Sequence, residues 1–161
     1  DPADEDTDVS ALIDPGESER VKSWIDDAVA AGAKVATGGR IEGRLLLPTV
    51  LTDVTPDMKV CVHEVFGPVV AVQVYDDFED ALRLADDSVY GLQAAVFTSD
   101  IGKALTAARS LHYGGVLINE VPTWRADHMP YGGTRESGNT REGPAYAVRE
   151  MTEERLVVIQ P

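Results

Sequence analysis

Apolar side chains recur every three or four residues in three stretches of the chain, the spacing that places them on one face of an α-helix. The first predicted helix begins near Glu17 and ends at Gly32, a residue type that commonly follows the last helical turn. The third begins at Ser99 or Asp100, either of which can cap a helix. The three apolar stripes are Val21, Trp24, Ile25, Ala28 and Val29; Phe78, Ala81, Leu82 and Ala85; and Ile101, Leu105, Ala108 and Leu111. A short fourth helix is predicted over residues 144–151.

Short runs of β-branched and other apolar residues lie between these helices, a pattern typical of buried strands. The predicted strands are residues 33–37, 69–75, 92–98, 114–119 and a terminal strand at 155–159. Residues 45–51 contain Pro48, which lacks a backbone donor, so we expect an edge strand or an extended segment there. Because strands alternate with helices, the sequence predicts an α/β fold built on a parallel sheet.

The periodic pattern stops after Asn119, and residues 120–143 form a long loop rich in Gly, Pro and charged groups. Ligands of α/β sheets bind at the carboxyl ends of strands, so this loop is a candidate binding site. Arg125 offers a planar fork suited to a carboxylate, phosphate or phosphonate, although a salt bridge to an acid such as Asp127 is the alternative. His128 can act as a general base near neutral pH or hydrogen-bond the backbone, and Trp124 lies in the same loop.

A second candidate is the turn from His63 to Pro68, just before a predicted strand. A carboxylate held there, Glu64, can accept hydrogen bonds from a pair of ligand hydroxyls. The ring of Phe66 can pack on a flat heteroaromatic ring. The alternative is that Glu64 is an ordinary solvated surface residue.

Cys61 is the single cysteine of the chain, which excludes an internal disulfide and zinc sites built on cysteine pairs. His63 would share a face with Cys61 on an extended segment, so a thiolate nucleophile is conceivable. The neighbours Val60 and Val62 favour a packing role instead. The histidines are too scattered to predict a metal site.

The chain of 161 residues carries 14 Lys and Arg against 28 Asp and Glu, a net charge of −14. This charge repels phosphate backbones, so we expect no nucleic-acid partner. No apolar run approaches the ~20 residues that span a bilayer, so we expect no membrane segment. The acidic first residues are unlike a signal peptide, which together with the lone cysteine predicts a cytoplasmic protein.

The order of motifs along nearly the whole chain resembles the aldehyde dehydrogenase superfamily. The motifs that carry the resemblance are Glu64-Val-Phe-Gly-Pro68, Tyr90-Gly-Leu92, Gly115-Val-Leu-Ile-Asn119, Pro130-Tyr-Gly-Gly133, Ser137-Gly138 and Arg141-Glu-Gly143. The loop Val-Pro-Thr-Trp-Arg-Ala-Asp-His-Met-Pro-Tyr, residues 121–131, resembles the branch that handles lactaldehyde, phosphonoacetaldehyde and related polar or anionic aldehydes.

The resemblance implies the C-terminal part of an α/β catalytic domain that ends in an oligomerisation strand. Residues 1–15 would be an acidic lead-in or severed linker, residues 16–152 the catalytic part, and residues 153–161 the strand of a homo-oligomer. The implied reaction is oxidation of a small-molecule aldehyde with NAD or NADP through a cysteine thiohemiacetal. The nucleophilic cysteine and the general-base glutamate would lie upstream, so the chain by itself would be inactive and Cys61 would not be the nucleophile.

The resemblance also implies roles for individual residues. Glu64 would hold the nicotinamide ribose hydroxyls and Phe66 would pack near the nicotinamide. Arg125 would anchor the anionic end of the substrate, with Trp124 and His128 beside it. Two other interpretations remain at this point: a non-catalytic oligomerisation or interaction module of the same family, and an unrelated acidic α/β binding domain.

Overall fold

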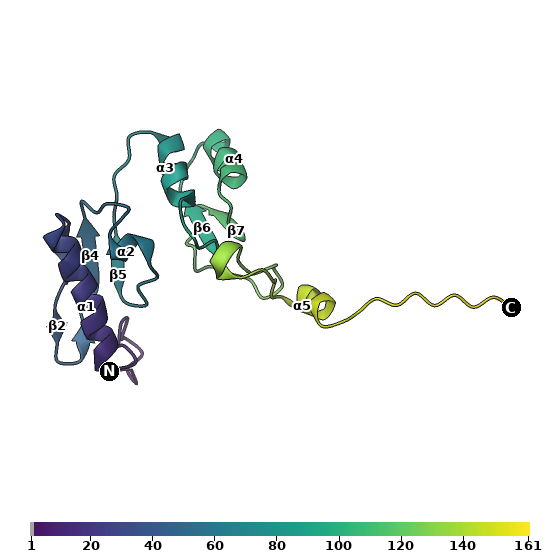
Figure 1. Cartoon of the computed structure of the whole chain (residues 1–161), viewed down its shortest axis with the longest axis horizontal. Helices are drawn as coiled ribbons and strands as arrows, with labels where there is room; N and C mark the ends of the chain where they lie inside the picture. The colour runs from purple at the N-terminus through teal and green to yellow at the C-terminus, as the bar shows by residue number, and fades with distance from the viewer. Residues whose placement is uncertain (1) are drawn as a thin grey trace. The chain divides into compact units, whose positions relative to one another are not determined.

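The computed structural model describes residues 2–161, which form two compact units that meet at Asp76 and Asp77 along the chain. The first unit consists of α1 (Pro15–Ala30), β1 (Lys34–Thr37), β2 (Ile41–Glu42), β3 (Leu45–Leu46), β4 (Thr49–Thr52), α2 (Lys59–Val62) and β5 (Val69–Ala71) (Figure 1). The second consists of α3 (Phe78–Asp86), β6 (Gln93–Val96), α4 (Ile101–Ser110), β7 (Gly115–Ile118), the 3-10 helix η1 (Arg135–Ser137) and α5 (Pro144–Glu150).

The first helix begins at a cap and stops at a glycine, and the prediction for this segment is confirmed. The Asp14 carboxylate accepts a hydrogen bond from the Glu17 N–H at 3.1 Å, and Pro15 occupies the first turn, where its missing donor costs nothing. Gly32 follows the last turn with φ +112°, a backbone conformation that favours glycine. The helix therefore starts two residues earlier than the apolar pattern alone predicted.

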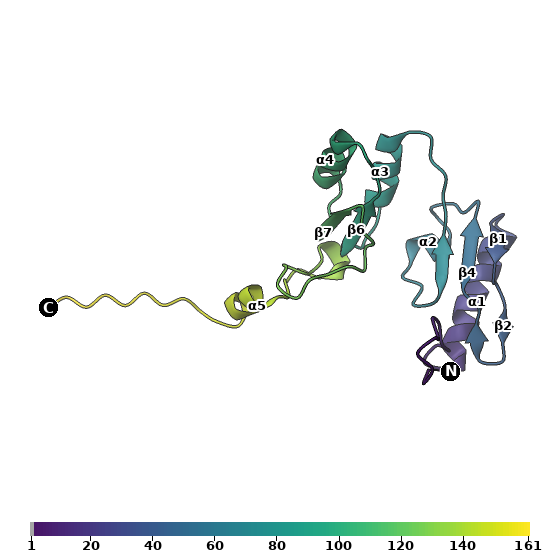
Figure 2. The same ribbon diagram turned by 180° about the vertical axis from the view of Figure 1, so that it is seen from behind.

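The sheet of the first unit has the order β1-β4-β5, with β1 antiparallel and β5 parallel to β4 (Figure 2). The prediction of an edge strand or extended segment at residues 45–51 is wrong for residues 49–51, because β4 is the middle strand. Pro48 lies between β3 and β4, so its missing donor interrupts neither ladder, and Thr49 N–H already donates to the Pro68 carbonyl at 2.8 Å. A separate antiparallel pair joins β2 and β3.

The core of the first unit forms where α1 packs against the sheet. Its buried members are Val21, Ile25, Ala28, Ala33, Leu46, Leu51, Val54, Met58 and Val60. Val29, which the apolar stripe included, is exposed, because it lies at the edge of that stripe, about 80° around the helix from the buried Val21. The buried face of α1 is therefore narrower than predicted.

In the second unit, α3 and α4 pack against the parallel pair β6–β7. Leu82 of α3 and Ala107 of α4 meet Ala94, Val96 and Val116 of the two strands. Asp77 caps α3 and Asp100 caps α4, each accepting two hydrogen bonds from first-turn N–H groups, so one of the two predicted caps is confirmed.

The predicted apolar stripe of α4 is wrong in part. Ile101 is 73% exposed and Leu105 is 49% exposed, whereas the small residues Ala104 and Ala107 are buried together with Leu111. Alanines let the helix axis approach the strands closely, so the packing face is set by residue size as well as hydrophobicity.

The α/β class is confirmed, but the sheets differ from a single parallel sheet. The first unit contains a mixed sheet, and only β6–β7 is purely parallel. Residues 152–161 continue from α5 without helix or strand, and no strand among residues 2–161 pairs with 155–159 (Figure 1). Leu156 and Ile159 are exposed there, so the oligomerisation strand stays a prediction. None of the helices described for residues 2–161 is long and apolar enough to cross a membrane.

Candidate functional site

The turn Glu64–Pro68 connects α2 to β5 and has a strained backbone. Phe66 adopts φ +50°, in the left-handed region that non-glycine residues rarely occupy, and its side chain is 72% exposed. Gly67 lies directly on α1, since a Cβ atom there would stand 3.1 Å from Cγ2 of Val21. The glycine therefore lets the turn approach the helix while Phe66 faces solvent.

Side chains of α1 hold this turn. Arg20 Nη2 donates to the Val65 carbonyl at 2.9 Å, and Arg20 Nε and Nη2 donate to Glu17 Oε2 at 2.9 and 2.7 Å. The guanidinium stands 4.7 Å from the centre of the Trp24 ring, which in turn lies 5.6 Å from the ring of His63. The turn is thus fixed from the helix side by a charged hydrogen bond and a ring contact.

Glu64 is exposed, and within residues 2–161 its carboxylate makes no hydrogen bond or ion pair. An ionised carboxylate accepts at two oxygens, so it can receive both hydroxyls of a vicinal diol. The neighbouring Phe66 ring is an exposed apolar plane. The residues present therefore fit a ligand that combines a ribose with a flat heteroaromatic ring.

Cys61 does not have the environment of a nucleophile. It lies on α2 rather than on an extended segment, so the expected shared face with His63 does not exist, and His63 instead contacts Trp24. Partial burial of the thiol, and then the charge of Asp57, raise the pKa of Cys61 above its usual value. The expectation of a packing role is also wrong, because Cys61 is exposed.

The second candidate, the loop after β7, fixes Arg125 from two sides. Its guanidinium lies 4.4 Å from the centre of the Tyr131 ring, and Nη1 stands 3.2 Å from Glu142 Oε2. The acid that pairs with Arg125 is therefore Glu142 and not Asp127. Tyr131 and Glu142 form an isolated antiparallel bridge, in which the Glu142 N–H donates to the Tyr131 carbonyl at 2.6 Å. The Arg125 side chain thus contacts both residues of this bridge and is half-exposed to solvent.

Trp124 and His128 are exposed in the same loop. The Trp124 carbonyl accepts a hydrogen bond from Gln93 Nε2 of β6 at 3.4 Å. In the described part of the chain, no hydrogen bond, ion pair or ring contact joins the side chains of Trp124, Arg125 and His128. The loop presents all three to solvent. The turn belongs to the first unit and the loop to the second.

An ion pair between Arg135 and Asp86, which no local sequence pattern predicted, holds η1 in the second unit. Arg135 Nη2 stands 2.9 Å from Asp86 Oδ2, and Nη1 donates to the carbonyls of Asp86 and Ser88, each at 2.8 Å. The His112 N–H donates to Asp86 Oδ1 at 2.7 Å. Burial raises the pKa of Asp86, but hydrogen bonds from His112 and Arg135 outweigh it, so the pKa lies below its usual value.

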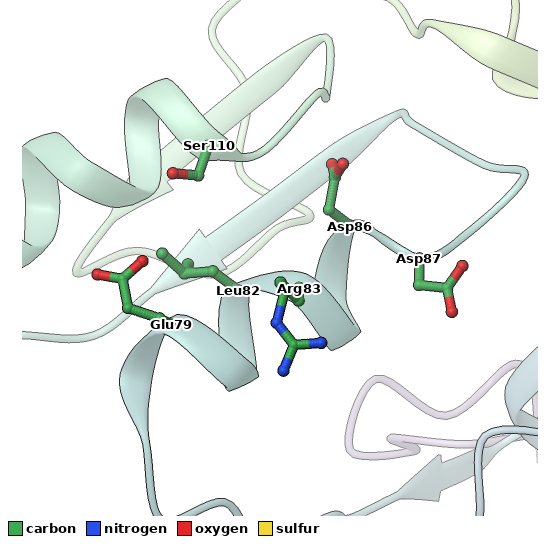
Figure 3. A pocket seen from close by; sticks show the side chains of 6 residues that line it. All are labelled: Glu79, Leu82, Arg83, Asp86, Asp87 and Ser110. Atoms are coloured by element: carbon green, nitrogen blue, oxygen red, sulfur yellow. The ribbon is translucent and has the colours of Figure 1, made fainter.

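A shallow depression of about 370 Å³ lies beside α3 (Figure 3). It is lined by Glu79, Leu82, Arg83, Asp86, Asp87 and Ser110. None of the predicted site residues lines it, and Leu82 is its only large apolar side chain. Among residues 2–161, no group of three His, Cys, Asp or Glu side chains could hold a metal ion.

The model of the aldehyde dehydrogenase family matches residues 1–157, so the chain belongs to the aldehyde dehydrogenase family. Over 158 residues the chain is 50% identical to 3-sulfolactaldehyde dehydrogenase of Priestia aryabhattai, covering 98% of this chain and 33% of the relative. It is 44% identical to lactaldehyde dehydrogenase of Methanococcus aeolicus, covering 98% of this chain and 34% of that protein. The chain therefore spans about a third of the length of these curated relatives.

Solved structures support the same fold. Aldehyde dehydrogenase 21 of Physcomitrella patens, in complex with succinate, matches with TM-score 0.91 and 39% identity over 94% of this chain and 32% of that one. Glyceraldehyde-3-phosphate dehydrogenase of Methanocaldococcus jannaschii, complexed with NADP, matches with TM-score 0.88 and 40% identity over 93% of this chain and 32% of that one. Betaine aldehyde dehydrogenase of Staphylococcus aureus, in complex with NAD+, matches with TM-score 0.84 and 37% identity over 91% of this chain and 30% of that one. The resemblance found in the sequence is confirmed, and the family uses NAD(P).

Proposed function

We propose that this chain forms the C-terminal part of the catalytic domain of an NAD(P)-dependent aldehyde dehydrogenase for short polar or anionic aldehydes. The observation that carries the proposal is the family match over residues 1–157, with 50% identity to a 3-sulfolactaldehyde dehydrogenase. In the proposed reaction a cysteine thiolate adds to the aldehyde carbonyl and gives a thiohemiacetal. NAD(P), when bound, would supply the hydride acceptor, and water would hydrolyse the resulting thioester to the acid and the regenerated thiol.

The nucleophile and the general base of this reaction are assigned to polypeptide upstream of these 161 residues. The raised pKa of Cys61 supports this assignment, because a thiol that stays protonated at neutral pH is a poor nucleophile. Residues 1–161 produced alone are accordingly inactive in this proposal.

The turn of the first unit is the proposed cofactor contact. Glu64 accepts hydrogen bonds from the two hydroxyls of the nicotinamide ribose, and Phe66 packs beside the nicotinamide ring. Two features of the turn support these roles: the carboxylate is exposed without a partner in residues 2–161, and the Phe66 ring is 72% exposed on a strained backbone. Strained exposed residues concentrate at binding sites, because the strain persists only where the surroundings enforce it.

The loop of the second unit is the proposed substrate contact. Arg125 pairs with the anionic end of the aldehyde through the donors that Glu142 does not occupy, because Glu142 contacts Nη1 alone. Trp124 forms an apolar wall, and His128 donates to the polar end of the substrate. The sulfonate of 3-sulfolactaldehyde is an anion of the kind that an arginine fork binds.

The division of the chain follows from the same proposal. Residues 1–15 precede the catalytic part, residues 16–152 belong to it, and residues 153–161 pair as a strand in a cytoplasmic homo-oligomer. The exposed run Leu156-Val-Val-Ile159 supports the last point, since consecutive apolar residues that pair with no strand in the described chain suit an added strand. The same exposed segment favours the second candidate function, a non-catalytic oligomerisation module.

Glu64→Gln tests the cofactor assignment. In the native gene product this change is expected to raise KM for NAD(P) about tenfold, because a charge-assisted hydrogen bond contributes about 1.5–3 kcal/mol and the amide retains part of it. KM for the aldehyde should stay within about twofold, since the substitution acts on cofactor binding. Steady-state kinetics with each substrate varied in turn measures both.

Glu19→Gln is the matched control, because Glu19 is an exposed glutamate of α1 with no hydrogen bond or ion pair inside the described chain. It removes the same charge from the same unit. Equal effects of the two substitutions on KM for NAD(P) would contradict the assignment of Glu64.

A further inference from the structure

The Glu64–Pro68 turn depends on one side chain outside it. Phe66 sits at φ +50°, a costly conformation for a non-glycine residue that persists only where the surroundings enforce it. Within residues 2–161, residues 64–66 make a single hydrogen bond, from Arg20 Nη2 to the Val65 carbonyl at 2.9 Å. Val65 lies between Glu64 and Phe66 along the chain, the two residues proposed to contact the cofactor.

We propose that Arg20 is a positioning residue for cofactor binding: it holds the Val65 carbonyl against α1 and thereby orients Glu64 and Phe66. This inference rests on the proposed function of the turn. Without the hydrogen bond, the strained peptide relaxes toward extended φ values, and both side chains lose their fixed direction.

Arg20 is itself held on several sides. Glu17 Oε2 accepts from Nε and Nη2 at 2.9 and 2.7 Å, and the Trp24 ring lies 4.7 Å below the guanidinium. The side chain is also partly buried. A guanidinium fixed in this way loses little entropy when it binds a carbonyl, so the contact can impose a backbone conformation.

The chemistry of the contact calls for arginine. One Nη2 atom reaches both Glu17 and Val65, and the planar fork lies on the indole. Lysine has a single nitrogen and no plane to stack, so Arg20→Lys keeps the charge but only part of the geometry. The same helix carries a matched control, Lys22, whose Nζ binds Asp26 at 2.6 Å and does not contact the turn.

The test compares Arg20→Met, Arg20→Lys and Lys22→Met in the native gene product. Amide hydrogen exchange is measured at Thr49 and Val69, whose N–H groups donate to carbonyls at the end of the turn at 2.8 Å each. KM is measured for NAD(P) and for the aldehyde. We expect Arg20→Met to speed exchange at the turn and to raise KM for NAD(P), each about tenfold, with KM for the aldehyde within about twofold. Arg20→Lys should fall between wild type and Arg20→Met, and Lys22→Met should leave both readouts unchanged.

Two results overturn the inference. One is exchange at Thr49 and Val69 that is no faster in Arg20→Met and Arg20→Lys than in Lys22→Met. The other is an unchanged KM for NAD(P) in Arg20→Met when Glu64→Gln raises it. If Glu64→Gln itself has no effect, the cofactor role of the turn is wrong, and the exchange rates alone decide whether Arg20 positions it. Should Arg20→Met fail to fold, Arg20→Lys supplies the same comparison.

Discussion

Arg125→Leu is expected to raise KM for an anionic short aldehyde by about 10- to 100-fold, because one charge-assisted pair contributes about 1.5–3 kcal/mol. KM for propanal, which has no charged end, should change by less than about twofold. The guanidinium lies 4.4 Å from the centre of the Tyr131 ring and uses Nη1 for Glu142 at 3.2 Å, so its other donors are available to the substrate. Initial rates of NAD(P) reduction by the native gene product with each aldehyde measure the difference.

Arg109→Leu is the matched control, since Arg109 is an exposed arginine of α4 with no hydrogen bond or ion pair in the described residues of the second unit. Arg109→Leu separates the effect of losing one positive charge from the effect of losing the Arg125 guanidinium. An Arg125→Leu variant that weakens both aldehydes equally would end the idea that the loop selects an anion.

Gly114→Ala is expected to destabilise the second unit by about 3 kcal/mol or more. A Cβ atom at Gly114 would stand 1.6 Å from the Gly132 carbonyl oxygen and 3.1 Å from Cα of Gly133, and both are backbone atoms that cannot rotate away. This contact is where the loop after β7 closes onto the start of β7. Urea unfolding, with the free energy extrapolated to water, measures the cost.

The adjacent glycine provides the comparison. A Cβ atom at Gly115 would meet only side-chain atoms of Gln93, the nearest at 3.2 Å, and that side chain is flexible. Gly115→Ala should therefore cost less than about 1 kcal/mol. Similar losses for the two variants would show that the close approach of the backbone at Gly114 does not fix the loop.

Much of the local structure could be predicted from the sequence, because caps and spacing act over a few residues. Asp100 caps α4, and Gly32 follows the first helix, as the sequence predicted. The packing face of α4 could not be predicted, since Ile101 and Leu105 satisfy the same helical spacing as the buried alanines. Which stripe is buried depends on the strands that the helix meets.

The position of β4 in its sheet likewise could not be predicted from the local sequence pattern. Pro48 indicated an edge, but the strand starts one residue later, and its neighbours β1 and β5 come from both sides along the sequence. Strand order follows from contacts between segments that are distant in the sequence, and a single proline does not report it.

The candidate site shows the same difference between local features, which could be predicted, and long-range contacts, which could not. Glu64 and Phe66 could be singled out because a Gly-Pro turn and a family motif surround them. Arg20, which holds that turn, lies 45 residues away from Val65, and Glu142 lies 17 residues beyond Arg125. No spacing rule links such partners, so the residues that orient a site emerge only from the folded chain.

The most direct measurement is the rate of NAD(P) reduction with 3-sulfolactaldehyde, for the native gene product and for residues 1–161 produced alone. The dehydrogenase assignment predicts steady reduction by the native product, a kcat/KM at least about tenfold higher than with propanal, and no reduction by residues 1–161. A native product that reduces neither NAD nor NADP with either aldehyde, or an active 161-residue chain, would contradict it.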